Sequence, residues 1–139
     1  MSNIALISCV KKKAKYRAKA RDLYTSTLFI KSLKYAESKL KPDKIFILSA
    51  KYGLLNLNNE IEPYDETLKG KSREVQRDWA NNIFIQISKE CDVKNDNFIF
   101  LAGKEYYKDL IAYLPNTEIL MEKLTFLKRL QWLKRKLDE

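Results

Sequence analysis

Short runs of apolar residues alternate along the chain with longer segments in which apolar residues recur every three or four positions. Unbroken apolar runs occupy residues 4–7, 45–48 and 98–101. Such runs are typical of strands that are buried on both faces of a parallel sheet. We therefore predict strands over residues 3–8, 45–48 and 97–102, and a weaker fourth strand over residues 118–121.

The segments between the first strands have the spacing of amphipathic helices. One helix is predicted over residues 27–41, with Pro42 just beyond its end. A second helix begins after Ser72, whose hydroxyl can cap it, and has Glu74 in its first turn. The stripes expected to be buried are Phe29, Leu33, Ala36 and Leu40 in the first helix, and Val75, Trp79, Ile83 and Ile87 in the second.

Two more helices are predicted in the last third of the chain. The first is stopped by Pro115, and the second runs over residues 123–137 with a basic face opposite its apolar ridge. Their apolar faces are Tyr106, Leu110, Tyr113 and Leu114, and then Phe126, Leu130, Leu133 and Leu137. Residues 56–69 include Pro63 and several turn formers, so an irregular loop is expected there.

This alternation of strands and helices predicts the fold class. We expect a single α/β domain over residues 1–139, a three-layer α/β/α sandwich around a small, mainly parallel four-stranded sheet, Rossmann-like in its layering. In open sheets of this kind, the loops that leave the carboxyl ends of the strands form the ligand crevice. The candidate chemistry is therefore sought where the apolar runs end.

Composition limits the class of protein. The 139 residues are 45% hydrophobic, as in an ordinary globular protein, and no apolar run approaches the roughly 18 residues of a membrane span. The first residues read as a strand without a signal peptide's basic leader. Cys9 and Cys91 have no metal-ligand spacing and form no disulfide framework. We expect a cytoplasmic protein with reduced thiols and no membrane association.

The basic residues are clustered, and the net charge is +9. One cluster lies in residues 11–21, a second in residues 123–136, and an acidic segment over residues 60–66 lies between them in the sequence. Clustered positive charge suits a polyanionic partner, which here means nucleic acid or the phosphates of a nucleotide. A solvated lysine-rich surface would produce the same pattern.

Few residues offer catalytic chemistry. The chain has no histidine, so most catalytic triads and most zinc or iron sites are excluded, and no metal is expected. Asp65, in the Pro63-Tyr64-Asp65 corner, is the candidate carboxylate: it could deprotonate a water or stabilise an oxocarbenium ion. It could equally cap a turn or pair with Lys51. Cys9 follows the first strand and precedes three lysines, which favours a nucleophilic thiolate, although a small packed residue fits the same position.

More residues are candidates for ligand binding. Serine hydroxyls and lysines near the strand ends would hold phosphate, Gly53 permits a turn, tyrosines could stack on a base, and Arg129 could clamp a phosphate. There is neither a Walker loop nor a GxGxxG fingerprint, so triphosphate hydrolysis and dinucleotide chemistry gain no support, and no cofactor is expected. The candidates are Ser8, Lys12, Lys13, Tyr24, Ser26, Ser49, Lys51, Tyr52, Gly53, Tyr64, Gly103, Tyr106 and Arg129.

Several of these motifs together resemble a known family. They are Ile-Ser-Cys-Val-Lys-Lys-Lys at residues 7–13, Ala-Arg-Asp-Leu-Tyr-Thr-Ser at 20–26, Leu-Ser-Ala-Lys-Tyr-Gly-Leu at 48–54, Pro-Tyr-Asp at 63–65 and Arg-Leu-Gln-Trp-Leu at 129–133. Their order resembles a family of small prokaryotic and phage proteins with a domain of unknown function, often labelled YaaA-like peroxide-stress proteins. The family pattern usually has a glycine before the last helix, which residues 125–128 lack.

The serine and lysine motifs are more distantly similar to a domain of archaeosine synthase, which acts on a modified base in transfer RNA. The resemblance implies nucleic-acid or nucleoside chemistry. Two functions follow as expectations: an enzyme acting at a nucleobase or its glycosidic bond, or a non-catalytic module that binds nucleic acid or sequesters a nucleotide. A third possibility is a regulatory protein whose basic faces meet an acidic protein.

Overall fold

A mostly parallel five-stranded sheet forms the centre of the molecule. The computed structural model describes residues 1–8 and 12–139. The strand order is β4-β3-β1-β6-β7, with β4 at Gly53–Asn56, β3 at Lys44–Ser49, β1 at Asn3–Ser8, β6 at Asn97–Leu101 and β7 at Thr117–Ile119. β1 is parallel to β3 and β6, and β7 is parallel to β6, whereas β4 runs antiparallel to β3.

The register brings the ends of the parallel strands together. Ile7 of β1 lies opposite Ile47 of β3 on one side and Leu101 of β6 on the other. The predicted strands over residues 3–8, 45–48 and 97–102 are therefore confirmed in position and direction. We call the side of the sheet at which β1, β3 and β6 end its carboxyl end.

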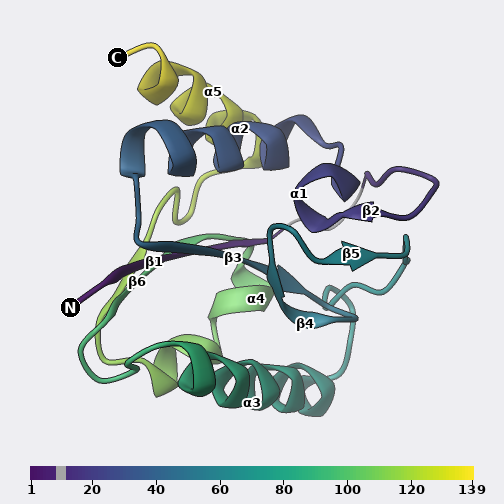
Figure 1. The fold of residues 1–139 in the computed structure, drawn as a ribbon, viewed down its shortest axis with the longest axis vertical. Helices are drawn as coiled ribbons and strands as arrows, with labels where there is room; N and C mark the ends of the chain where they lie inside the picture. Colours follow the sequence, from purple (N-terminus) through teal and green to yellow (C-terminus); the bar gives the residue numbers. More distant parts are fainter. Residues whose placement is uncertain (9–11) are drawn as a thin grey trace.

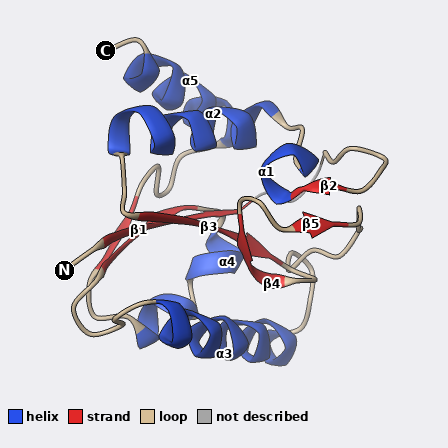
Figure 2. Ribbon diagram, in the orientation of Figure 1, coloured by secondary structure: helices blue, strands red, loops and turns tan. Residues whose placement is uncertain are grey.

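Helices cover both faces of the sheet (Figures 1 and 2). On one face lie α2 (Thr27–Tyr35), its π-helical continuation η1 (Ala36–Leu40), and α5 (Phe126–Leu137). On the other face lie α3 (Arg73–Glu90), α4 (Lys104–Tyr107) and the 3₁₀ turn η2 (Leu110–Tyr113). Ser72 caps α3 as predicted, because its Oγ accepts a hydrogen bond from the Val75 N–H at 3.2 Å.

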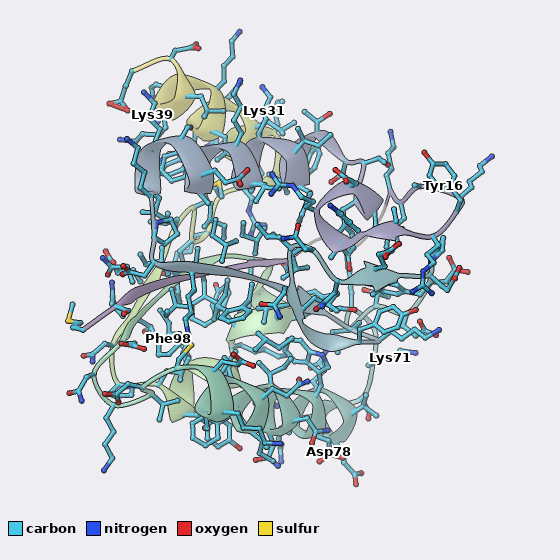
Figure 3. All side chains as sticks on the ribbon, in the orientation of Figure 1. Tyr16, Lys31, Lys39, Lys71, Asp78 and Phe98 are labelled. Atoms are coloured by element: carbon cyan, nitrogen blue, oxygen red, sulfur yellow. The ribbon has the colours of Figure 1, made fainter. Side chains whose placement is uncertain are left out.

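The alternation of side chains along each strand divides the core into two clusters. Ile4, Leu6 and Phe98 pack against α3, and Figure 3 shows Phe98 between the sheet and that helix. Ala5 and Ile7 of β1 face the opposite way, toward α2. Both clusters are well buried, so the sheet is apolar on both faces, as its unbroken apolar runs indicated.

The sheet has five strands rather than the four predicted. Gly53 has φ +76°, in the left-handed region, and it turns the chain back along the edge of β3. The returning strand β4 has only four residues, with Leu54 and Leu55 facing opposite clusters. So short a segment carries no detectable period in the sequence.

The structure also contains a second, two-stranded sheet that the sequence did not predict. It pairs β2 (Ala18–Lys19) with β5 (Glu60–Ile61), next to the short helix α1 (Ala20–Leu23). The pairing places the acidic segment beside the basic one: Arg17 lies within 3.5 Å of Glu62 and 3.9 Å of Glu60. The two segments, separate in sequence, thus partly neutralise each other.

The predicted third helix is broken into α4 and η2. The two residues at the break bond to α3: Lys108 Nζ donates to Gln76 Oε1 at 2.5 Å, and Arg73 Nη1 donates to Asp109 Oδ2 at 2.6 Å. Tyr113, predicted to be buried, is 42% exposed.

Two predicted core residues at helix starts are exposed as well. Val75 is exposed because Gln76 occupies the buried position in that turn. Phe126, at the start of α5, is 61% exposed, whereas Leu133 further along the same helix is fully buried. Within residues 1–8 and 12–139, no helix combines the length and the apolar character needed to cross a membrane.

Candidate functional site

The carboxyl end of the sheet gathers polar side chains from distant parts of the sequence. β1 ends at Ser8, whose Oγ accepts a hydrogen bond from the Gly103 N–H at 3.1 Å. β3 ends at Ser49, which is fully buried, and Trp79 Nε1 of α3 donates to the Ser49 carbonyl at 2.9 Å. One hydrogen bond therefore joins the exits of β1 and β6, and another fixes the exit of β3 to α3.

A cavity of about 540 Å³ opens beside the ends of β1 and β6. We call it the β1–β6 cavity. Its walls come from the ends of these strands, from the start of α2, from the turn after β7 and from the start of α5. The residues that line it include Ser8, Ser26, Phe29, Ser32, Leu101, Gly103, Tyr106, Met121, Phe126 and Arg129.

The charged groups of the cavity are mainly positive. Among the residues that the structure describes, Lys69, Lys104 and Arg129 line it, against the single carboxylate of Glu105. Arg129 Nε donates to the Leu124 carbonyl at 3.1 Å, which fixes the plane of the guanidinium. The two Nη groups are then the donors that remain for a ligand, and they suit two oxygens of one anion.

Helix starts add to this positive potential. The Ser26 hydroxyl caps α2 by accepting from the Phe29 N–H at 3.2 Å, and Thr125 caps α5 by accepting from the Lys128 N–H at 3.3 Å. Both helices therefore present their positive ends near the cavity, where an anion is favoured.

The turn between β7 and α5 has an unusual backbone. Met121 has φ 60° and Lys123 has φ 67°, both in the left-handed region that glycine adopts most easily. The glycine expected before the last helix is absent, and non-glycine residues make the turn instead. Met121 is buried and lines the cavity, so this turn shapes one wall of it.

A chain of buried hydroxyls lies beside the cavity. Ser49 Oγ accepts from the Lys51 and Tyr52 N–H groups at 3.3 and 2.9 Å, and it donates to the Tyr64 hydroxyl at 2.9 Å. The Tyr64 hydroxyl lies 2.5 Å from that of Tyr24. Tyr24 and Tyr64 are almost fully buried, so this chain fixes the loops after β3 and before α2 to each other.

Most of the chain matches one protein family. Residues 4–135 match the model of a family of unknown function, DUF6884. The chain belongs to this family. No curated protein is significantly similar to it.

Five of the residues predicted for the site of this DUF6884 protein line the β1–β6 cavity. They are Ser8, Ser26, Gly103, Tyr106 and Arg129. Tyr24, Ser49 and Tyr64 form the hydroxyl chain, and Tyr52 donates its N–H to it. Tyr24 packs against the lining residue Phe29, but none of these four residues lines the cavity. Gly53 is the first residue of β4.

The predicted lysines take other positions. Lys13 Nζ lies 4.5 Å from the centre of the Tyr64 ring, and Lys51 Nζ lies 5.4 Å from that of Tyr52, so both make cation–π contacts. The Lys12 side chain is exposed, and its carbonyl accepts from the Thr25 N–H at 2.9 Å. None of the three lines the cavity.

Of the two proposed catalytic residues, Asp65 is described by the structure and does not line the cavity. Asp65 is exposed, and its side chain forms no ion pair with the described residues, Lys51 included. Cys9 lies outside the residues that the structure describes. The carboxylate that lines the cavity is Glu105, which sequence reasoning missed.

Other lining residues that were missed include Ser32, Lys69, Lys104 and Phe126. Lys104 and Glu105 follow directly after the Gly103 strand end, so the rule that found Gly103 would have found them. Lys69 gave no such signal, because its place depends on the path of an irregular loop.

One phenol next to the lining residues in the sequence, that of Tyr107, has a perturbed pKa. Burial raises the pKa of the Tyr107 phenol, with smaller contributions from Glu122, which raises it, and Arg129, which lowers it. Tyr107 therefore stays neutral at physiological pH and acts as a packing residue. In the described part of the chain, no group of three or more His, Cys, Asp or Glu side chains has the arrangement of a metal site.

Proposed function

We propose that this protein binds a nucleotide, either free or as one unit of a nucleic acid, in the β1–β6 cavity. The observation that carries the proposal is the lining of this cavity at the carboxyl end of a mostly parallel sheet. The described lining residues supply three cations against one carboxylate, with serine hydroxyls and apolar side chains. A volume of about 540 Å³ is within the range of about 300 to 1,000 Å³ that small-molecule sites occupy.

The charged residues favour a phosphate as the anionic part of the ligand. Arg129 offers its two Nη groups, and Lys69 and Lys104 add point charges at the rim. The phosphate role expected for Lys12, Lys13 and Lys51 is thus better filled by these three residues.

The nucleoside part of the proposal draws support from the apolar wall and from the resemblance to YaaA-like proteins and a domain of archaeosine synthase. A reaction at the glycosidic bond needs a carboxylate near the sugar. Glu105 lines the cavity and is the carboxylate that we assign to this role, whereas Asp65 does not line it. The alternative is a module that binds the same ligand without turnover.

Calorimetric titration tests the binding proposal. Wild-type protein should bind nucleoside 5′-monophosphates, and Arg129→Gln should weaken this binding at least about tenfold, which corresponds to about 1.4 kcal/mol. Arg135→Gln is the matched control, because Arg135 lies on the same helix but outside the cavity. Equal affinity of both variants, or no binding by the wild type, would refute the proposal.

Chromatography of the reaction products distinguishes the enzyme hypothesis from that of a non-catalytic binding module. The enzyme releases free base from a nucleotide or an oligonucleotide, Glu105→Gln abolishes this release while binding persists, and Asp65→Asn leaves it intact. Binding without any release of base supports the module instead.

A further inference from the structure

Phe126 is an apolar residue in an unexpected place. Its position in the sequence fits the apolar ridge of α5, yet its side chain is 61% exposed and lines the β1–β6 cavity. It is absent from the ring pairs that the described aromatic residues form. A flat apolar surface is therefore presented to the cavity rather than to the core.

The exposed ring of Phe126 lies close to Arg129 on α5. The two residues are three positions apart in α5, so their side chains lie on the same side of the helix, one turn apart. Both line the same cavity. One turn of α5 thus offers a ring face and, next to it, two guanidinium donors fixed in plane by the Leu124 carbonyl.

We propose that Phe126 stacks on the base of the bound nucleotide while Arg129 holds its phosphate. This inference rests on the proposed function and adds the residue that recognises the base. Aromatic rings bind bases in this way because every base has a π face, and the stacking tolerates different bases. The ligand class is therefore a nucleotide with an intact base, with little preference for which base it carries.

The part of the cavity wall that α2 contributes is compatible with this arrangement. Leu28 and Phe29 of α2 also line it, and Phe29 is packed against Tyr24 at 5.0 Å between ring centres. Phe29 is 1% exposed and belongs to the core. Of the two phenylalanines that line the cavity, Phe126 is the one whose ring is open to a ligand.

The test compares two ligands that differ only in the base. Adenosine 5′-monophosphate and ribose 5-phosphate are titrated against wild type, Phe126→Leu and Arg129→Gln. Phe126→Leu should weaken binding of the nucleotide by about 5- to 150-fold and leave that of ribose 5-phosphate unchanged. Arg129→Gln should weaken both ligands alike. Phe126→Tyr, which keeps a ring, should restore the affinity for the nucleotide.

The neighbouring residue provides the control. Leu127 is 63% exposed and does not line the cavity, so Leu127→Ala should bind both ligands as wild type does. Because Phe126 is exposed, its replacement should leave the thermal midpoint unchanged. Unchanged nucleotide affinity in Phe126→Leu, or equal losses for both ligands, would overturn the stacking role while the Arg129 result still supports the proposed function. Failure of the wild type to bind either ligand would overturn both.

Discussion

Tyr64 holds the loops next to the cavity together through one hydroxyl group. Ser49 Oγ donates to it, and the Tyr24 hydroxyl lies 2.5 Å away. Lys13 Nζ stands over its ring. Since the side chain is 7% exposed, water cannot replace these bonds when they are broken.

Removal of this hydroxyl should therefore be costly. Tyr64→Phe leaves the buried Ser49 and Tyr24 hydroxyls each without one partner, and we expect a loss of about 1 to 3 kcal/mol in the free energy of unfolding. Urea denaturation measures this change. The control is Tyr52→Phe, whose hydroxyl bonds to the Glu62 carbonyl at an exposed site, so its loss should be smaller. Equal effects would show that the buried chain contributes nothing beyond an ordinary surface hydrogen bond.

Single residues were predictable from the sequence where a strand ended. Ser8 and Ser49 end their strands and Gly103 follows the end of β6 closely, because an apolar run that stops abruptly marks the end of a buried strand. Asp65 was selected for its local sequence alone. Whether a loop carboxylate faces a cavity depends on the path of the loop. An irregular loop has no repeating apolar pattern in the sequence, so its path could not be predicted.

At the scale of elements, α3 fixes the irregular loop that carries Lys69. Gln76 is buried: its Nε2 donates to the Leu68 carbonyl at 2.8 Å, and its Oε1 accepts from Lys108 Nζ at 2.5 Å. A polar residue thus replaces the apolar one expected in the first turn of the helix. It ties the loop, α3 and the break between α4 and η2 to each other.

Loss of the Gln76 side-chain amide should lower both the free energy of unfolding and the affinity for a nucleotide. Gln76→Ala removes both hydrogen bonds and leaves the Lys108 ammonium half-buried without its acceptor, so we expect a loss of about 1 to 3 kcal/mol in unfolding free energy. Nucleotide affinity should fall too, because Lys69 follows the released Leu68. The neighbouring exposed residue gives the control: Arg77→Ala should change neither quantity in calorimetry or urea denaturation. A Gln76→Ala variant of normal stability and affinity would contradict this role.

The sequence predicted elements well where a long period existed. The helix over residues 73–90 is long enough to show its period, and the three buried strands were marked by unbroken apolar runs. β4, β2 and β5 have four, two and two residues, and they form because neighbouring segments meet in space. The same reason explains the split of the third helix, whose break is held by Gln76 and Arg73 of another element.

Across the whole molecule, the positive charge is concentrated on one face of the sheet. α5 carries Lys128, Arg129, Lys134, Arg135 and Lys136 without an acidic residue. α3 carries as many acidic residues as basic ones. Figure 3 shows Lys31 and Lys39 in the layer of α2 and Asp78 on the outer side of α3. The basic segment near the N-terminus contributes less than its sequence indicated, because Arg17 and Arg21 pair with acidic side chains.

This asymmetry predicts how a nucleic acid would approach if the bound nucleotide is part of a polymer. Its backbone should follow the face of α2 and α5, since the cavity opens at the starts of these helices.

Replacing Lys134, Arg135 and Lys136 by Gln should weaken the binding of a labelled oligonucleotide. It should also reduce the slope of log affinity against log salt concentration by about 0.7 to 0.9 for each phosphate that is no longer neutralised. Fluorescence anisotropy between about 50 and about 200 mM salt measures this slope. The matched variant replaces Arg77, Lys89 and Lys94, which are exposed on or just after α3 and form no ion pair with the described residues, and it should leave the slope unchanged. Binding of a mononucleotide should be similar in both triple variants, because neither set lines the cavity; an oligonucleotide slope that falls equally in both would show that the charge asymmetry does not direct the polymer.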